Sequence, residues 1–244
     1  KTNTALDEIG AVICVTFTPE HIMPADAPSA QSRLGLPNNC MAFDINMACS
    51  GYGYGLYIGS LLTKQLNKKV LVLDGDVQSA YVSKLDKATM PVMGDAGTAT
   101  LLTPSDSEEV WKFAFYSDGS QRNVLYIPAG GAKKKTTAED VVDIAYDDGS
   151  KRKNIDIYME GYGIFKFVAI TASKFIKSFM AENNLSDENI DIFVPHQANS
   201  RIIEYAQKKL GIPVEKFCIE IEKFGNTSSA SIPIVLDRMN RDGR

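Results

Sequence analysis

Short apolar runs alternate along the chain with longer, more polar stretches, and this alternation predicts an α/β protein. Runs bounded by glycine, proline or polar residues predict seven strands. These lie at residues 9–16, from 41 onward, at 70–76, up to 102, and at 111–117, 190–194 and 217–221. The intervening stretches predict helices that end near 33, begin near 49, span about 163–181, run to 209 and follow 231. The polar segment 118–155 predicts long surface excursions.

The predicted helix after Cys49 carries four glycines, at positions 51, 53, 55 and 59. A glycine inside a helix costs about 1 kcal/mol relative to alanine, and close packing against another backbone is the usual reason to keep it. Cys49 lies where this helix begins, and there the unpaired N–H groups and the helix dipole favour loss of a thiol proton. The position fits a nucleophile, and it also fits a buried, inert cysteine.

Composition narrows the functional classes. A net charge of −4 and a pI near 5.3 argue against general nucleic-acid binding, because no basic excess is present to neutralise phosphates. The four cysteines form no CxxC pair and the two histidines are too few for a His-rich metal cluster, so we expect free thiols and no metal. No apolar run approaches the roughly 18 residues of a membrane span. The start of the chain lacks a signal-peptide layout, so we expect a cytoplasmic protein.

An internal repeat relates residues 17–37 to residues 193–213. Seven of these 21 paired positions are identical, where about one or two are expected by chance. The identical residues are Phe, Pro, Ala, Gln, Leu, Gly and Pro, at positions 17, 19, 30, 31, 34, 35 and 37. The repeat predicts two α/β halves related by a pseudo-twofold axis, residues 1–110 and 111–244.

Three chemically capable side chains lie at predicted strand-to-helix turns: Cys49, His196 and Asn226. Such turns are at the carboxyl ends of strands, where open α/β sheets bind ligands. If the halves pack face to face, the three side chains converge on one pocket. Taken alone, His196 also fits a satisfied structural histidine and Asn226 a turn or N-cap residue. Their matched placement favours a functional site.

Three segments resemble the signatures of β-ketoacyl-ACP synthase III, the initiating condensing enzyme of bacterial fatty-acid synthesis. They are Ala48–Tyr52, Val194–Asn199 and Gly225–Pro233, which read ACSGY, VPHQAN and GNTSSASIP. The similarity extends through residues 93–97 and 159–166, so it covers nearly the whole chain. Elongating synthases would have a second histidine at position 226, and thiolases resemble this pattern with a second cysteine.

The resemblance implies a thiolase-like α/β fold with two pseudo-twofold-related halves whose sheets pack around buried helices. It implies a decarboxylative Claisen condensation of an acyl-CoA primer with malonyl-ACP, giving 3-oxoacyl-ACP through an acyl-Cys49 intermediate. The Cys49 N–H would contribute to an oxyanion hole, and His196 and Asn226 would donate hydrogen bonds to the malonyl thioester. It implies acyl-CoA and malonyl-ACP as substrates, with no cofactor.

Further positions match the family's binding residues. Asn199 and Gly161 match residues that line the pantetheine tunnel, and Lys87 falls where an arginine contacts CoA phosphates. Met23 aligns with a residue that reaches across a homodimer interface into the partner's acyl pocket. A basic patch that receives acyl carrier protein is matched by Lys166, Arg201, Lys208 and Lys209. Lys208 and Lys209 also fit a simple complement to a helix dipole.

Three departures from the family pattern affect the expected activity. The chain begins at what resembles the family's second strand, and it stops at Arg244, before two final strands and a Gly-rich loop. Tyr162 stands where an asparagine is common in the family. We therefore expect a fragment lacking both ends. Two alternatives to a working condensing enzyme stay open at this point: a Cys-His-Asn acyl hydrolase, and an inactive condensing-enzyme fragment.

Overall fold

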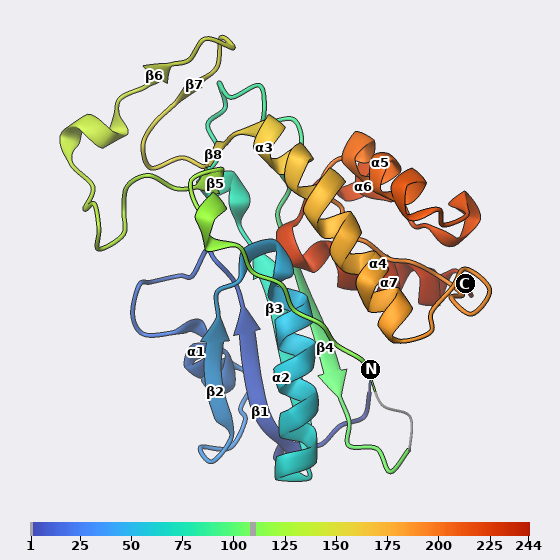
Figure 1. The fold of residues 1–244 in the computed structure, drawn as a ribbon. Helices are drawn as coiled ribbons and strands as arrows, with labels where there is room; N and C mark the ends of the chain where they lie inside the picture. Colours follow the sequence, from blue (N-terminus) through green and yellow to red (C-terminus); the bar gives the residue numbers. More distant parts are fainter. Residues whose placement is uncertain (1, 108–110) are drawn as a thin grey trace. The chain divides into compact units, whose positions relative to one another are not determined.

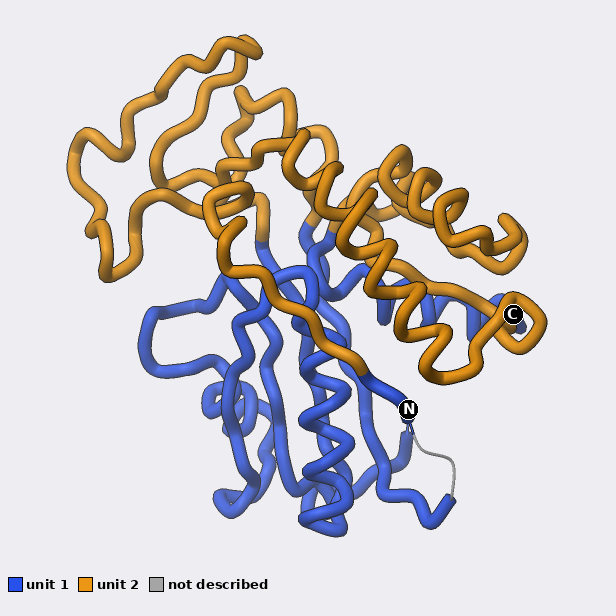
Figure 2. Tube along the Cα trace, viewed as in Figure 1, with its two compact units in different colours: residues 1–77, 95–113, 227–244 blue, residues 78–94, 114–226 orange. Residues whose placement is uncertain are grey.

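The computed structural model describes residues 2–107 and 111–244, which divide into two compact units. Unit 1 comprises residues 1–77, 95–113 and 227–244, and unit 2 comprises residues 78–94 and 114–226 (Figure 2). The last segment belongs to unit 1 because the turn at Ser228–Ala230 contacts β3 and helix α7 (Ser231–Arg241) contacts β4. These units differ in extent from the halves expected at 1–110 and 111–244, whose pseudo-twofold relation stays a prediction.

Unit 1 is built on a four-stranded sheet in the order β2-β1-β3-β4 (Figure 1). Its strands are β1 (Ile9–Val15), β2 (Met41–Ile45), β3 (Lys69–Asp76) and β4 (Ala96–Leu102). Strand β1 runs parallel to β2 and β3, and β4 runs antiparallel to β3. All seven residues of β1 are buried, as expected for a central parallel strand covered on both faces. The first four predicted strands are thus confirmed.

Helices cover both faces of this sheet. Helix α1 (Asp26–Arg33) contributes Ala27 to a core cluster with Ile9, Val12 and Cys14, and Asp44 accepts hydrogen bonds from the first N–H groups of the helix. Helix α2 (Gly51–Leu66) packs on the other face, against a cluster formed by Ala11, Ile13, Val15, Ile45, Val70, Val72 and Leu102.

Three of the four glycines of α2 explain the close approach of helix and sheet. A Cβ at Gly51 would lie 2.4 Å from Val15, one at Gly55 would lie 3.0 Å from the same side chain, and one at Gly59 would lie 2.5 Å from Leu102. Close packing is confirmed at these positions, although the atoms that approach the helix belong to side chains of the sheet and not to its backbone. It is wrong at Gly53, where a Cβ would meet nothing within 4 Å.

Unit 2 is dominated by helices. A continuous helical stretch comprises α3 (Gly161–Lys166), a π-helical segment (Phe167–Ala172) and α4 (Ser173–Glu182), which confirms the long helix expected here. The other helices of the unit are α5 (Ser200–Leu210) and α6 (Ile221–Phe224). Ile203, Ile212 and Phe217 form its core cluster, and the ring of Phe193 stacks on that of Phe217 with centroids 4.8 Å apart.

Three predicted strands are wrong. Residues 111–117 form no strand. Segments 190–194 and 217–221 share a single bridge, Phe193 with Phe217, and α6 already begins at Ile221. An apolar run has the composition of a strand. A strand also needs a neighbouring segment that pairs with it over several residues, and these two segments pair only at Phe193 and Phe217.

The polar segment 118–155 forms surface excursions, as expected. Its regular structure is limited to short pairs: β5 (Leu125–Tyr126) with β8 (Tyr158–Met159), and β6 (Ile144–Ala145) with β7 (Lys151–Arg152). Short 3-10 turns complete the chain at Leu6–Glu8, Ala48–Ser50, Gln78–Ala80, Gly119–Gln121, Ala138–Val141, Val214–Lys216 and Ser228–Ala230.

Candidate active site

Cys49 lies in the 3-10 turn Ala48–Ser50, between the end of β2 and the start of α2. The turn is sharp because Ala48 adopts a left-handed conformation with φ of 42°, which residues with a side chain rarely adopt. The Ser50 N–H closes it by donating to the Met47 carbonyl at 3.2 Å. The sequence predicted this place for Cys49 correctly.

The expected ease of deprotonation is wrong. Burial raises the pKa of the Cys49 thiol to about 11, and the negative charge of Asp76 adds to this rise. A side-chain hydrogen bond from Ser228 favours the thiolate but only partly offsets the burial. The cost of moving the thiolate out of water therefore outweighs the helix start, and the neutral thiol predominates near pH 7.

The segment Thr227–Ser231 packs beside the Cys49 turn. All five of its residues are buried, and its own 3-10 turn contacts the turn that holds Cys49. Ser228 has a φ of 55°, so a side-chain residue is again held in the left-handed region. The sequence singled out only Asn226 from this motif. The run of small polar residues that follows was the available signal for a segment that must fit closely.

Asn226 is 6% exposed, and its main chain is held from both sides within unit 2. Its N–H donates to the Val92 carbonyl at 2.7 Å, and its own carbonyl accepts from Gly94 N–H and from the Gln78 side chain. Gly225 is required beside it, because its φ is +71° and a Cβ there would lie 2.7 Å from the Val92 oxygen. Asn226 is not an N-cap, since Thr227 precedes the next helical turn.

His196 lies in a turn braced by its neighbour Gln197. The Gln197 amide, which is buried, donates to the Pro195 and Cys218 carbonyls and accepts from the Glu220 N–H. The Asn226 side chain then donates to the carbonyl of Ala198, in the same turn, at 3.4 Å. The structure therefore brings the His196 and Asn226 segments together within unit 2. Cys49 belongs to unit 1, and its convergence with them stays a prediction.

Two positioning residues were missed from the sequence, Gln78 and Gln197. Gln78 bridges the carbonyls of Gly94 and Asn226 at 2.9 and 2.6 Å, in the same way that Gln197 ties its turn to Cys218. Both are about 2% exposed. A polar residue directly beside a predicted strand end was the only signal, and solvated loop residues give the same signal.

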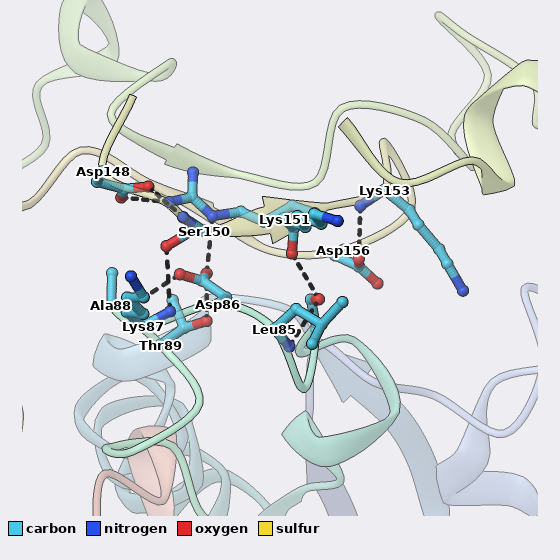
Figure 3. Close-up of polar contacts among 12 residues, drawn as sticks. Leu85, Asp86, Lys87, Ala88, Thr89, Asp148, Ser150, Lys151, Lys153 and Asp156 are labelled. Carbon is cyan, nitrogen blue, oxygen red and sulfur yellow. Dashed lines mark hydrogen bonds and ion pairs between the residues drawn. The ribbon is translucent and has the colours of Figure 1, made fainter. Parts of the chain in front are cut away.

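Lys87 is exposed, but the loop that carries it is firmly attached to residues 148–152 (Figure 3). Its N–H donates to Ser150 at 3.1 Å, and buried Asp86 pairs with buried Arg152 at 2.8 Å. Burial alone would raise the pKa of Asp86, but hydrogen bonds from Thr89 and Ala88 and the charge of Arg152 hold it below its usual value.

The two expected tunnel residues flank helix starts. Asn199 is the N-cap of α5, and its side-chain oxygen accepts from the Arg201 N–H at 3.0 Å. Gly161 opens α3, is exposed, and has nothing within 4 Å of the place a Cβ would take. Tyr162, the departure from the family pattern, is also exposed.

The four expected docking residues lie on α3 and α5. Arg201 and Lys208 share a face of α5 with Tyr205, whose ring packs edge-on against Phe165 with centroids 5.1 Å apart. Lys166 is the next residue along α3. Lys209 contributes to a groove of about 490 Å³. The groove is otherwise lined by Ala169, Ile170, Ser173, Lys174, Lys177, Ser178 and Ala181.

Among the described residues, no group of three or more His, Cys, Asp or Glu side chains is arranged to hold a metal ion. In the same part of the chain, no helix has the length and hydropathy needed to cross a bilayer.

Comparison with known proteins places this geometry in a family. A family model described as 3-oxoacyl-[acyl-carrier-protein] synthase III matches residues 43–119, and the model of its C-terminal part matches residues 180–244. A β-ketoacyl-[acyl-carrier-protein] synthase III from Rhodopirellula baltica is 34% identical over 262 residues, covering 99% of this chain and 73% of that protein. The chain belongs to the β-ketoacyl-ACP synthase III family.

Solved structures of synthase III enzymes agree with this assignment. A crystal structure of a 3-oxoacyl-(acyl-carrier-protein) synthase III matches with a TM-score of 0.95 and 31% identity, over 100% of this chain and 73% of that one. The synthase III of Thermus thermophilus matches with a TM-score of 0.80 and 31% identity, over 97% of this chain and 70% of that one. The fold is therefore the thiolase fold, and the family is one of acyl-transferring condensing enzymes. The hydrolase alternative is not favoured.

Proposed function

We propose that this synthase III condenses an acyl-CoA primer with malonyl-ACP and releases CO₂, with Cys49, His196 and Asn226 carrying the chemistry. The observation that carries these roles is that two hydrogen-bond donors, His196 and Asn226, lie on segments joined through the Ala198 carbonyl. A pair of neutral donors suits an enolate oxygen. The nucleophile is supplied separately, by Cys49 at the start of α2.

In the first half-reaction the Cys49 sulfur attacks the thioester carbonyl of acyl-CoA. The Cys49 N–H, at the start of the helix, donates to the oxyanion that forms. Because the pKa of the thiol is about 11, its proton leaves as the sulfur attacks. The departing CoA sulfur takes up that proton, so acyl-Cys49 and CoA are the products.

In the second half-reaction the bond between the malonyl carboxylate and its neighbouring carbon breaks. The electron pair moves into an enolate on the ACP thioester, and the N–H groups of His196 and Asn226 stabilise the enolate oxygen. The enolate carbon then attacks acyl-Cys49, forming the new C–C bond and releasing the Cys49 thiolate, which takes up a proton. His196 donates in its neutral form and need not carry a charge.

Substrate handling is assigned to the more exposed residues. Lys87 would meet the phosphates of CoA on a loop already held by the Asp86–Arg152 pair (Figure 3). Gly161 leaves room for the pantetheine arm, because nothing stands where its Cβ would be. Asn199 uses its oxygen to cap α5 and keeps its side-chain N–H groups for a pantetheine carbonyl.

Acyl carrier protein would dock on the basic face of α3 and α5 made by Lys166, Arg201, Lys208 and Lys209. The Phe165–Tyr205 contact gives this face an apolar centre, and the cations around it suit an acidic partner. For a homodimer, the support is the exposure of Ile22 and Met23, at 93% and 82%. Large apolar side chains this exposed suit an interface. Such an enzyme would work in the cytoplasm.

The direct test is intact mass spectrometry after incubation with acetyl-CoA and longer acyl-CoAs. We expect an acyl adduct on the unchanged chain, none on Cys49→Ala, and a normal adduct on the control Cys40→Ala, whose cysteine is buried elsewhere. With malonyl-ACP added, a ketoacyl product and CO₂ should replace the adduct. Loss of the adduct by hydrolysis, without a ketoacyl product, would instead identify an acyl hydrolase.

A further inference from the structure

Strand β3 ends with two carboxylates on the face that packs against α2. Burial alternates along the strand, so Val70, Val72, Asp74 and Asp76 point the same way. The two valines belong to the apolar core cluster, whereas the two aspartates are 2% and 3% exposed at the carboxyl end of the strand. Burying a carboxylate is costly unless it gains strong partners, so each of the two requires an explanation.

Asp76 is explained by the loop after β1. One of its oxygens accepts hydrogen bonds from the Thr16 hydroxyl at 2.9 Å, from the Phe17 N–H at 2.8 Å and from the Thr18 hydroxyl at 3.3 Å. Because three donors of one segment bind this carboxylate, Asp76 anchors the loop after β1 to the end of β3.

Asp74 has a different partner. Its Oδ1 accepts a 2.5 Å hydrogen bond from the hydroxyl of Ser229, which is fully buried and 155 positions away in the sequence. Its Oδ2 is buried and has no hydrogen-bond partner among the described residues. Burial raises the pKa of Asp74 to about 7; the Ser229 hydrogen bond opposes this rise and Asp76 adds to it.

Ser229 connects Asp74 to the nucleophile. It lies in the turn Ser228–Ala230, and its Oγ is 3.5 Å from the position a Cβ of Gly51 would take, two residues after Cys49. Its neighbour Ser228 is fully buried and held at a φ of 55°, and its side chain lowers the pKa of the Cys49 thiol. All of these residues belong to unit 1.

We infer that Asp74 is a positioning residue for Cys49: through Ser229 it fixes the turn Ser228–Ala230 against the turn that carries Cys49. This inference rests on the proposed role of Cys49 as nucleophile. A left-handed backbone at Ser228 persists only if neighbouring contacts stabilise it. The Asp74–Ser229 hydrogen bond lies in the same turn and can provide such a contact. Asp74 itself touches no substrate.

The inference assigns the effect of Asp74 to its hydrogen bond with Ser229 and not to its charge. Among the residues that the structure describes, the ionisable groups found to interact with Asp74 or Cys49 are Asp76 on the same strand and Tyr52 on α2. The negative charge that raises the pKa of the Cys49 thiol is that of Asp76, whereas Asp74 acts through its hydrogen bond to Ser229. An asparagine at this position keeps a partner for Ser229 but cannot ionise.

The test is the rate of iodoacetamide alkylation at Cys49 between pH 5.5 and 9, read from the mass of its peptide, with acylation by acetyl-CoA measured in parallel. Asp74→Val and Ser229→Ala should each slow alkylation by about tenfold, and the double variant should be no slower, because both break one connection. Asp74→Asn should restore the rate, because it keeps a hydrogen-bond acceptor for Ser229.

Asp44→Asn is the matched control, since Asp44 is a carboxylate of the same sheet that holds α1. It should alter stability but leave the alkylation profile unchanged. Unchanged alkylation in folded Asp74→Val, or multiplied effects in the double variant, would overturn the inference. Alkylation needs no substrate, so a chain that fails to take an acyl group yet shows these profiles would refute the proposed function and leave the positioning role standing.

Discussion

At the scale of single residues, burial shifts the pKa of a thiol and a carboxyl group in unit 1, those of Cys49 and Asp74. Burial raises the pKa of both Cys49 and Asp74 because each is uncharged when protonated. Both side chains are therefore held in their neutral forms more strongly than they would be in water. On the proposed mechanism, the Cys49 thiol loses its proton only as the sulfur attacks the thioester. The hydrogen-bond donors to the oxyanion are already in place at that point.

Asp74 should leave a signature in stability. Its pKa rises from about 4 to about 7 on folding, so the folded state holds this proton more tightly than the unfolded chain. The stability it contributes is fully present below about pH 4 and is lost as pH rises to about 7. Asp74→Asn avoids this loss, with a limiting difference of about 4 kcal/mol at about 1.4 kcal/mol per pH unit.

Urea unfolding of the unchanged chain and of Asp74→Asn, at several pH values between 4 and 8, measures this difference in stability. The difference in unfolding free energy between variant and unchanged chain should grow in favour of Asp74→Asn across that range and then level off. Other carboxylates, such as Asp86 and Asp148, have pKa values that fall on folding and also make stability depend on pH. Their contribution is the same in both proteins, so it cancels in the difference between variant and unchanged chain. A difference that stays constant with pH would show that Asp74 is ionised throughout.

At the scale of elements, α2 offers two glycines two positions apart in opposite surroundings. A methyl group at Gly55 would press on the stiff, fully buried side chains of Val15 and Val72 at 3.0 and 3.1 Å, whereas one at Gly53 would meet nothing. Gly55→Ala should therefore destabilise the fold by about 1–3 kcal/mol through overpacking. Gly53→Ala should stabilise it by up to about 1 kcal/mol through helix propensity.

Thermal or urea unfolding of the two single variants decides the point, because both make the same chemical change in the same helix. Equal effects would mean that α2 and the sheet adjust their separation freely. That would contradict the conclusion that glycine sets how closely they pack.

In unit 2, the Asp86–Arg152 pair joins the loop that carries Lys87 to strand β7. Arg152 is 4% exposed, pairs with Asp86 and Asp148, and lies 4.4 Å from the ring centre of Tyr146. Arg152→Met leaves Asp86 buried without its cation and should cost about 3–5 kcal/mol. Adding Asp86→Asn should recover part of that loss, since the uncompensated charge is then removed.

A double-mutant cycle measured by urea unfolding gives the interaction free energy between Asp86 and Arg152. The KM for acyl-CoA then tests whether this pair also holds the loop that carries Lys87. Loosening the loop of Lys87 should raise that KM more than it lowers kcat. If the two single losses simply add, the pair is not a coupled unit and the loop is held by its backbone hydrogen bonds instead.

Much of unit 1 was predictable because its strands are apolar, short and separated by clear stops. Cys49 was placed correctly for the same reason, at the junction between an alternating segment and a glycine-rich helix. The segments around Phe193 and Phe217 were not predictable, since composition does not show how many residues a neighbour pairs with. The pKa of Cys49 was misjudged because desolvation of the thiol depends on residues distant in sequence, and the buried segment Thr227–Ser231 packs beside the Cys49 turn.

At the scale of the whole molecule, a chain of net charge −4 presents a local basic face on α3 and α5. Long-range repulsion of an acidic partner is weak at physiological salt, where charges are screened beyond about 8 Å. If carrier protein docks on this face as proposed, its recognition depends on the cations nearest that face. We expect Arg201→Glu and Lys208→Glu each to raise the KM for malonyl-ACP by about tenfold and to weaken its dependence on salt.

The same variants should acylate Cys49 from acyl-CoA at the normal rate, because that half-reaction uses no carrier protein. Lys133→Glu is the matched control: it makes an identical charge change on an exposed residue of the same unit, away from α3 and α5. It should leave both half-reactions unchanged. Equal effects of all three substitutions would show that net charge governs the encounter, and slower acylation in Arg201→Glu would place that residue in the CoA site.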